Sequence, residues 1–117
     1  MTTDVHALYR RWIEEMWDGR VDVATELVSD DFVGHWPDHD VDGPQGLIGA
    51  MSQMHDMFSS IRFEIEVGPI AEGDLVAGRW RGQGSTTEGE SMAFIGNDLL
   101  RVSGGRFVEY WVATTPV

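Results

Sequence analysis

Asp98 is the residue of this sequence with the clearest potential for chemistry, because it stands in the middle of an apolar stretch. A period of two places one face of a predicted strand on the even-numbered positions, which are Phe94, Gly96, Asp98 and Leu100. We expect this face to be buried, since it carries two large apolar side chains; in the reversed orientation Asp98 would lie in solvent. A buried carboxyl group loses hydration, so its pKa rises and it can act as a general acid or base near neutral pH.

His35 is the second candidate, because an imidazole titrates in the range that proton transfer needs. It lies near the end of a short extended segment, and we expect it at the mouth of a cavity with Trp36 as an apolar wall. The structural alternative is a core histidine that hydrogen-bonds a backbone carbonyl. The other histidines are expected at the surface; they are His6, His39 and His55.

No metal site is predicted. The segment 38–43 begins like a calcium-binding loop, with alternate carboxylates followed by a glycine. The twelfth position of such a loop should hold a glutamate, but Gly49 stands there, so a solvated acidic loop is the better interpretation. A site built on His35, Asp38 and His39 is also unsupported, because the tryptophan and proline between them leave the side-chain directions undefined.

Five tryptophans are many for 117 residues, and they fall in four predicted elements. Most are expected in the core, because large aromatic rings bury much area. A cavity in a small domain also needs walls, and aromatic rings with methionines suit a flat hydrophobic ligand. The residues expected to contact such a ligand are Trp17, Trp36, Met51, Trp80 and Trp111.

The charge balance narrows the classes of partner and mechanism. The sequence has 20 acidic and 8 basic residues, and its net charge of -12 would repel phosphate backbones and anionic lipids. We therefore expect no nucleic-acid or membrane partner. All eight basic residues are arginine, so the absence of lysine excludes Schiff-base chemistry. The sequence has no cysteine, which excludes a thiolate nucleophile. Without a secretion signal or a membrane-spanning apolar run, a cytoplasmic location is expected.

Hydrophobic spacing predicts the elements that position these residues. Apolar residues at helical spacing predict three helices, over 5–17, 23–28 and 43–58. A short extended piece over 32–36 precedes a polar loop. Alternation then predicts strands over 61–67, 75–85, 92–102 and 107–112, the first of them closed by Gly68 and Pro69. Glycines inside these strands indicate bends or close approaches; they are Gly78, Gly82, Gly84 and Gly96.

This order of elements favours the α+β class. We expect residues 1–117 to form one domain, in which three N-terminal helices cover a curved antiparallel sheet. Such a cone encloses a pocket. The outer face of the sheet is expected to carry apolar residues such as Val76 or Val112.

With these residues in place, the chain resembles the SnoaL-like polyketide cyclases of the nuclear-transport-factor-2-like superfamily. Three segments carry the resemblance. Asp31–Pro37 is similar to the family's acidic residue followed by a His-x-Pro element. Residues 96–101 are similar to its Gly-x-Asp strand, and residues 105–111 are similar to its closing strand. In those cyclases the strand aspartate is the general acid/base of an intramolecular aldol closure that uses no metal or organic cofactor. The resemblance implies this role for Asp98 and no cofactor.

Further expectations follow from the same resemblance. The cyclases place a histidine on the preceding strand, where this chain has Gln83, which can stand near a ligand but cannot transfer protons. Relatives of the ketosteroid isomerase type place an acid near the Asp98 position and a base near His35, which suits proton abstraction beside a carbonyl. Family members often pair through the outer sheet face, so a homodimer is expected.

The leading hypothesis is a cofactor-independent enzyme of lyase or isomerase type that acts on a flat hydrophobic carbonyl compound. Asp98 would exchange a proton at the developing enolate, and His35 would relay it. The main alternative is a non-catalytic module for small-molecule binding or assembly, since one fold serves many functions. Epoxide hydrolysis is a third, with Arg79 or Arg81 beside Asp98, but the sequence offers no clear second acid.

Overall fold

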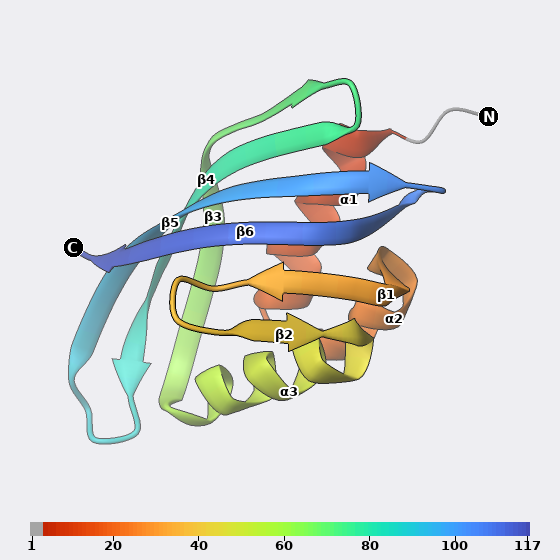
Figure 1. Cartoon of the computed structure of the whole chain (residues 1–117). Coiled ribbons are helices and arrows are strands. Elements are labelled where there is room, and N and C mark those ends of the chain that lie inside the picture. The colour runs from red at the N-terminus through yellow and green to blue at the C-terminus, as the bar shows by residue number, and fades with distance from the viewer. Residues whose placement is uncertain (1–3) are drawn as a thin grey trace.

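The helices lie against one side of a curved six-stranded sheet, as Figure 1 shows. This computed structural model describes residues 4–117. Its helical elements are α1 (Val5–Arg11), the π-helical continuation η1 (Trp12–Trp17), the short 3-10 turn η2 (Val21–Val23), α2 (Ala24–Leu27) and α3 (Gly43–Asp56). Its strands are β1 (Val28–His35), β2 (Asp40–Asp42), β3 (Phe58–Glu72), β4 (Leu75–Thr86), β5 (Ser91–Ser103) and β6 (Arg106–Pro116). The expected α+β class is confirmed.

The sheet has the strand order β2-β1-β6-β5-β4-β3. Strands β3 to β6 form the expected antiparallel meander. The sheet also contains one parallel pair that the sequence analysis did not predict, between β1 and β6. The chain leaves β1, builds α3 and the whole meander, and then returns beside β1 in the same direction. A short strand also replaces the expected polar loop, since β2 pairs with Val33–His35 of β1.

The first helix begins at Asp4, whose side chain accepts hydrogen bonds from the backbone N–H groups of His6 and Ala7. The predicted extent of 5–17 is confirmed, although its second half is π-helical. One stripe of this helix is buried against the sheet; it consists of Leu8, Tyr9, Trp12, Ile13 and Met16. Helix α3 begins with Pro44 in its first turn and buries Leu47 and Met51.

The strand that was expected to end at Gly68 and Pro69 continues to Glu72. The pairing register of β3 with β4 shifts between Val67 and Ile70, so the glycine and proline occupy an irregular stretch of the strand. Gly68 has a φ of 94°, which suits glycine and few other residues. A proline can stand inside a strand at such an irregularity, because no ladder hydrogen bond is needed there.

The two residues that were predicted on the outer face of the sheet, Val76 and Val112, do not lie there. Val76 and Val112 are buried on the inner face, because they alternate in phase with Trp80 and Tyr110. The large apolar side chains exposed on β3 and β5 are Val67, Ile70, Met92 and Leu99. The homodimer stays a prediction. In the described part of the chain, none of the helices combines the length and apolar character needed to span a bilayer.

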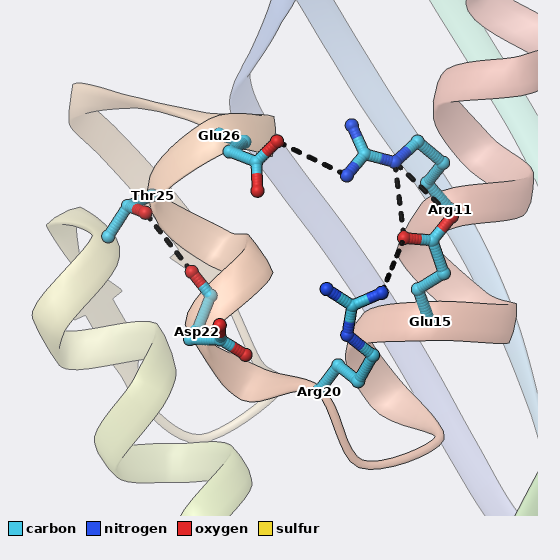
Figure 2. A network of polar contacts seen from close by, with 6 residues as sticks. All are labelled: Arg11, Glu15, Arg20, Asp22, Thr25 and Glu26. Atoms are coloured by element: carbon cyan, nitrogen blue, oxygen red, sulfur yellow. Dashed lines mark hydrogen bonds and ion pairs between the residues drawn. The ribbon is translucent and has the colours of Figure 1, made fainter.

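An ion-pair network joins the first helical segment to α2, as Figure 2 shows. Arg11 Nε donates to both carboxylate oxygens of Glu15 at 3.3 Å, and Arg11 Nη2 donates to Glu26 at 3.3 Å. Arg20 Nη1 lies 3.6 Å from Glu15 Oε1. Because Glu15 is shared by two arginines, it is the residue on which the network depends. The network therefore ties the helical segment Val5–Trp17, which carries Tyr9 and Trp17, to α2.

We expect Glu15→Gln to lower the free energy of unfolding by about 1 kcal/mol at low salt, because it removes both ion pairs of a partly exposed network. The difference should shrink in 1 M salt, which screens exposed charges. Urea unfolding at the two ionic strengths measures it. Glu14→Gln is the matched control, since Glu14 is exposed and has no ion pair among residues 4–117. Equal losses in both variants would contradict the role of the network.

Candidate active site

Asp98 lies on the inner face of β5 and is 4% exposed, so its predicted burial is confirmed. Three side chains donate hydrogen bonds to its carboxyl group. The Tyr9 hydroxyl donates to Oδ2 at 3.0 Å. Trp80 Nε1 and the Tyr110 hydroxyl donate to Oδ1 at 3.0 Å and 2.9 Å. Helix α1 and strands β4, β5 and β6 each contribute one member of this cluster, which we call the Asp98 cage.

Two glycines make room for the Asp98 cage. Gly78 is the partner of Asp98 on β4, and a Cβ atom there would lie 2.5 Å from the Tyr9 ring. Gly96 is the partner of Trp80 on β5, and a Cβ atom there would overlap the Trp80 indole. The two rings can therefore lie directly on the sheet beside the carboxyl group. This confirms close approach as the reason for both glycines.

Burial determines the ionisation of the cage. Loss of hydration raises the pKa of Asp98 to about 6, while the hydrogen bonds from Trp80, Tyr110 and Tyr9 oppose the rise because they favour the carboxylate. Burial, followed by the nearby charge of Asp98, raises the pKa values of Tyr9 and Tyr110 well above the ordinary range. Both hydroxyl groups therefore stay neutral. Asp98 is the group of the cage that changes charge near neutral pH.

A cavity of about 350 Å³ lies between the helices and the inner face of the sheet. Its walls are mainly apolar and aromatic, with a few polar groups. It is lined by Trp17, Trp36, His39, Ala50, Gln53, Met54, Met57, Phe63, Trp80, Phe94, Tyr110, Val112 and Thr114. Trp80 and Tyr110 belong both to this lining and to the Asp98 cage. Asp98 itself lies behind them, so it communicates with the cavity through these two residues.

The structure brings only part of the expected ligand-contact set together. Trp17, Trp36 and Trp80 line the cavity. Met51 is fully buried in the core and does not reach the lining, because it lies on the stripe of α3 that packs with Leu47. Gln83 and Trp111 are placed on the opposite face of the sheet, because each is one residue out of phase with an inward-facing neighbour.

His35 is not at the cavity mouth, which corrects the expected position. Its Nδ1 lies 2.9 Å from Asp40 and its Nε2 lies 2.8 Å from Glu109, and its ring stacks on Trp111 with centroids 5.6 Å apart. Hydrogen bonds with Glu109 and Asp40 raise the pKa of His35. The reason for the error is the period of two along β1, since Trp36 points into the cavity and its neighbour must therefore point away.

His39 was expected at the surface, where 56% of its side chain is exposed, and it also lines the cavity. Residues 36–39 turn the chain between β1 and β2, and the Trp36 N–H donates to the His39 carbonyl at 2.9 Å. The His39 ring stacks on Trp36 at the cavity, with centroids 5.8 Å apart and planes 14° apart. The signal was available in Pro37 and Asp38, a pair typical of a tight turn.

The site combines one buried titratable acid with a mainly apolar lining. Within residues 4–117, no group of three or more histidine, cysteine, aspartate or glutamate side chains is arranged to hold a metal ion. The Asp98 cage offers one acceptor to three donors, which stabilises the carboxylate form against the loss of hydration. The site can therefore bind a flat apolar molecule beside a titratable acid.

Asp98 should make stability depend on pH. Its pKa is about 6 in the folded chain and 3.8 in a model peptide, so its contribution is fully present below about pH 4 and is lost as pH rises through 6. We expect the unfolding free energy of the wild type, relative to Asp98→Asn, to fall by about 2 kcal/mol from pH 4 to pH 7. Urea unfolding of both proteins measures this difference, in which other titrating groups cancel. A difference independent of pH would contradict the raised pKa.

Known proteins share this fold over nearly its whole length. The family model of the SnoaL-like domain matches residues 9–110. A "putative SnoaL-like polyketide cyclase" from Jannaschia sp. CCS1 superposes with a TM-score of 0.82 at 19% identity, over 97% of this chain and 90% of that chain. A "putative polyketide cyclase" from Bacillus cereus ATCC 10987 has a TM-score of 0.80 at 26% identity, over 92% of this chain and 71% of that chain.

A third solved structure belongs to a hypothetical protein with a ketosteroid isomerase-like fold from Catenulispora acidiphila DSM 44928, in complex with trimethylamine. Its TM-score is 0.80 at 18% identity, over 96% of this chain and 86% of that chain. No curated protein sequence matches the chain. From the family match and the shared architecture, the chain belongs to the SnoaL-like family and has the cone-shaped α+β fold of the nuclear-transport-factor-2-like superfamily.

Proposed function

We propose that this protein is a cofactor-independent acid/base enzyme that acts on a flat, hydrophobic carbonyl compound, by intramolecular aldol closure or by enolisation. The observation that carries the proposal is the hydrogen bond between Asp98 and Tyr110. It links a buried acid, with a pKa of about 6, to a residue that lines an apolar cavity. The polyketide cyclases among the similar structures support the same class of substrate.

The Asp98 cage supplies a proton path in this proposal. When Asp98 is protonated, it donates to the Tyr110 oxygen, and the Tyr110 hydrogen is free to turn toward the cavity. As the substrate carbonyl becomes an enolate, its oxygen takes the Tyr110 proton, and the Tyr110 oxygen takes the proton of Asp98. One O–H bond forms for each that breaks, and the negative charge ends on Asp98. The α-proton of the substrate leaves to a water molecule at the solvent-exposed side of the cavity.

The rest of the lining favours an aromatic substrate. A volume of about 350 Å³ is within the range of small-molecule sites. The Trp36 ring stands edge-on to Tyr110 at 5.4 Å, and Phe63, Trp80 and Phe94 pack edge-to-face with one another. These rings leave flat apolar surfaces around the polar end that Tyr110 provides. His35, in contrast, lies across the sheet and has no part in this proposal.

A binding module without catalysis is the second candidate. The three hydrogen bonds to Asp98 favour this candidate, because a purely structural role of the carboxyl group is sufficient to explain them: it holds Tyr9, Trp80 and Tyr110 in place. Gln83 cannot replace the proton-transferring histidine that the cyclases carry on the preceding strand. In this case the cavity would bind an aromatic ligand and release it unchanged.

Deuterium exchange at the α-carbon of 1-tetralone, an aromatic ketone that can enolise, distinguishes the two candidates. We expect the wild type to accelerate exchange, with a rate that falls as pH rises through about 6 because Asp98 loses its proton. Tyr110→Phe should lower kcat at least about 100-fold, the usual contribution of a positioned acid. Proton NMR in D2O measures both.

Tyr9→Phe is the matched control, because it also removes one hydroxyl group from Asp98 but lies outside the cavity lining. We expect Tyr9→Phe to retain exchange. The pH at which the exchange rate falls should be higher than in the wild type, because one hydrogen bond that favours the Asp98 carboxylate is lost. Equal losses in the two tyrosine variants would show a general effect on packing and would contradict the proton path. Binding of 1-tetralone without any exchange by the wild type would favour the binding module.

A further inference from the structure

The side chain of His39 is held in one orientation at the solvent-exposed side of the cavity. Its ring is stacked nearly parallel on Trp36, and its Nδ1 lies 2.8 Å from Asp38 Oδ1. The backbone hydrogen bond from Trp36 to His39 closes the turn beneath both rings. Three independent contacts therefore place an imidazole in the lining, although 56% of its side chain is exposed.

The contact with Asp38 also selects the tautomer of His39. The hydrogen bond from His39 lowers the pKa of Asp38, so that carboxylate is ionised and can only accept. Nδ1 therefore carries the hydrogen of the neutral ring, and Nε2 keeps a lone pair. Within residues 4–117, Nε2 has no hydrogen-bond partner. In this tautomer Nε2 can accept a hydrogen bond from a hydroxyl group.

Trp36 contacts two polar residues of the lining, His39 and Tyr110, and the other polar lining residues are Gln53 and Thr114. Trp36 stacks on His39 at 5.8 Å and meets Tyr110 edge-on at 5.4 Å. Tyr110 is 1% exposed and faces the buried acid, whereas His39 stands beside solvent. The two residues also differ in chemistry, because Tyr110 donates a hydrogen bond and His39 Nε2 accepts one.

We propose that His39 is a ligand-recognition residue, and that the cavity selects flat aromatic ketones that carry a neutral hydroxyl group at the end opposite the carbonyl. The carbonyl would face Tyr110, a placement that rests on the proposed function, and the hydroxyl group would donate to His39 Nε2. Asp38 is the positioning residue, because it fixes the tautomer. The net charge of -12 and the neighbouring Asp38 disfavour a carboxylate at this end.

The affinities of 6-hydroxy-1-tetralone and 1-tetralone test this assignment, because the two ketones differ only in the hydroxyl group opposite the carbonyl. Isothermal titration calorimetry at pH 7.5 measures both affinities. We expect the wild type to prefer the hydroxylated ketone about 5- to 10-fold, the usual net effect of one hydrogen bond. His39→Phe keeps a ring to stack on Trp36 but removes both nitrogens, so the preference should fall below about 2-fold.

Asp38→Asn separates recognition from simple packing. It keeps the size of the side chain but weakens the selection of the tautomer, so it should give a preference between those of the wild type and His39→Phe. His6→Phe, on the exposed surface of α1, is the control and should behave as the wild type. Retention of the full preference in His39→Phe, or equal loss of affinity for both ketones, would overturn the assignment.

These affinities are measured at equilibrium, so they do not depend on turnover. A failure of the proposed enzyme activity would appear as absent deuterium exchange with an intact preference for the hydroxylated ketone. A failure of the His39 assignment would appear as intact exchange with no preference. An absence of any preference in the wild type would also overturn the assignment.

Discussion

The structure depends on one physical constraint, which is that a carboxyl group buried in a small apolar domain must find hydrogen-bond donors. Asp98 meets this requirement with Tyr9, Trp80 and Tyr110. These residues are far apart in the sequence, so the cage can form only when α1 is seated on the sheet and β4, β5 and β6 are in register. Gly78 and Gly96 belong to the same requirement, since a side chain at either position would displace a donor ring.

The alternation of side chains along the strands divides the functional residues between two faces. At the β1–β2 turn, Trp36 and His39 point to the cavity, whereas His35 and Asp40 form a pair on the other side. Trp111 completes this outer group by stacking on His35. The inner face therefore offers an apolar cavity with a buried acid, and the outer face carries a charged cluster. A single step in the sequence moves a residue from one environment to the other.

The parts of the fold that could be predicted from the sequence are those with a strong local period. The helical stripe from Leu8 to Met16 and the alternation that buries Asp98 are of this kind. The parallel pairing of β1 with β6 could not be predicted, because it joins segments that are separated by the third helix and the other three meander strands. Strand β2 has one buried residue, Val41, and so has almost no hydrophobic pattern. The position of His35 was wrong because the hairpin that determines the phase of β1 was not recognised.

The pH titration of Asp98 by carbon NMR of its carboxyl group tests the central claim most directly. The chemical shift should show an inflection near pH 6, because loss of hydration outweighs the three hydrogen bonds that favour the charged form. An inflection near pH 4, the ordinary range for aspartate, would show that the group keeps its hydration or is fully compensated. That result would remove the acid from which the proposed proton path begins.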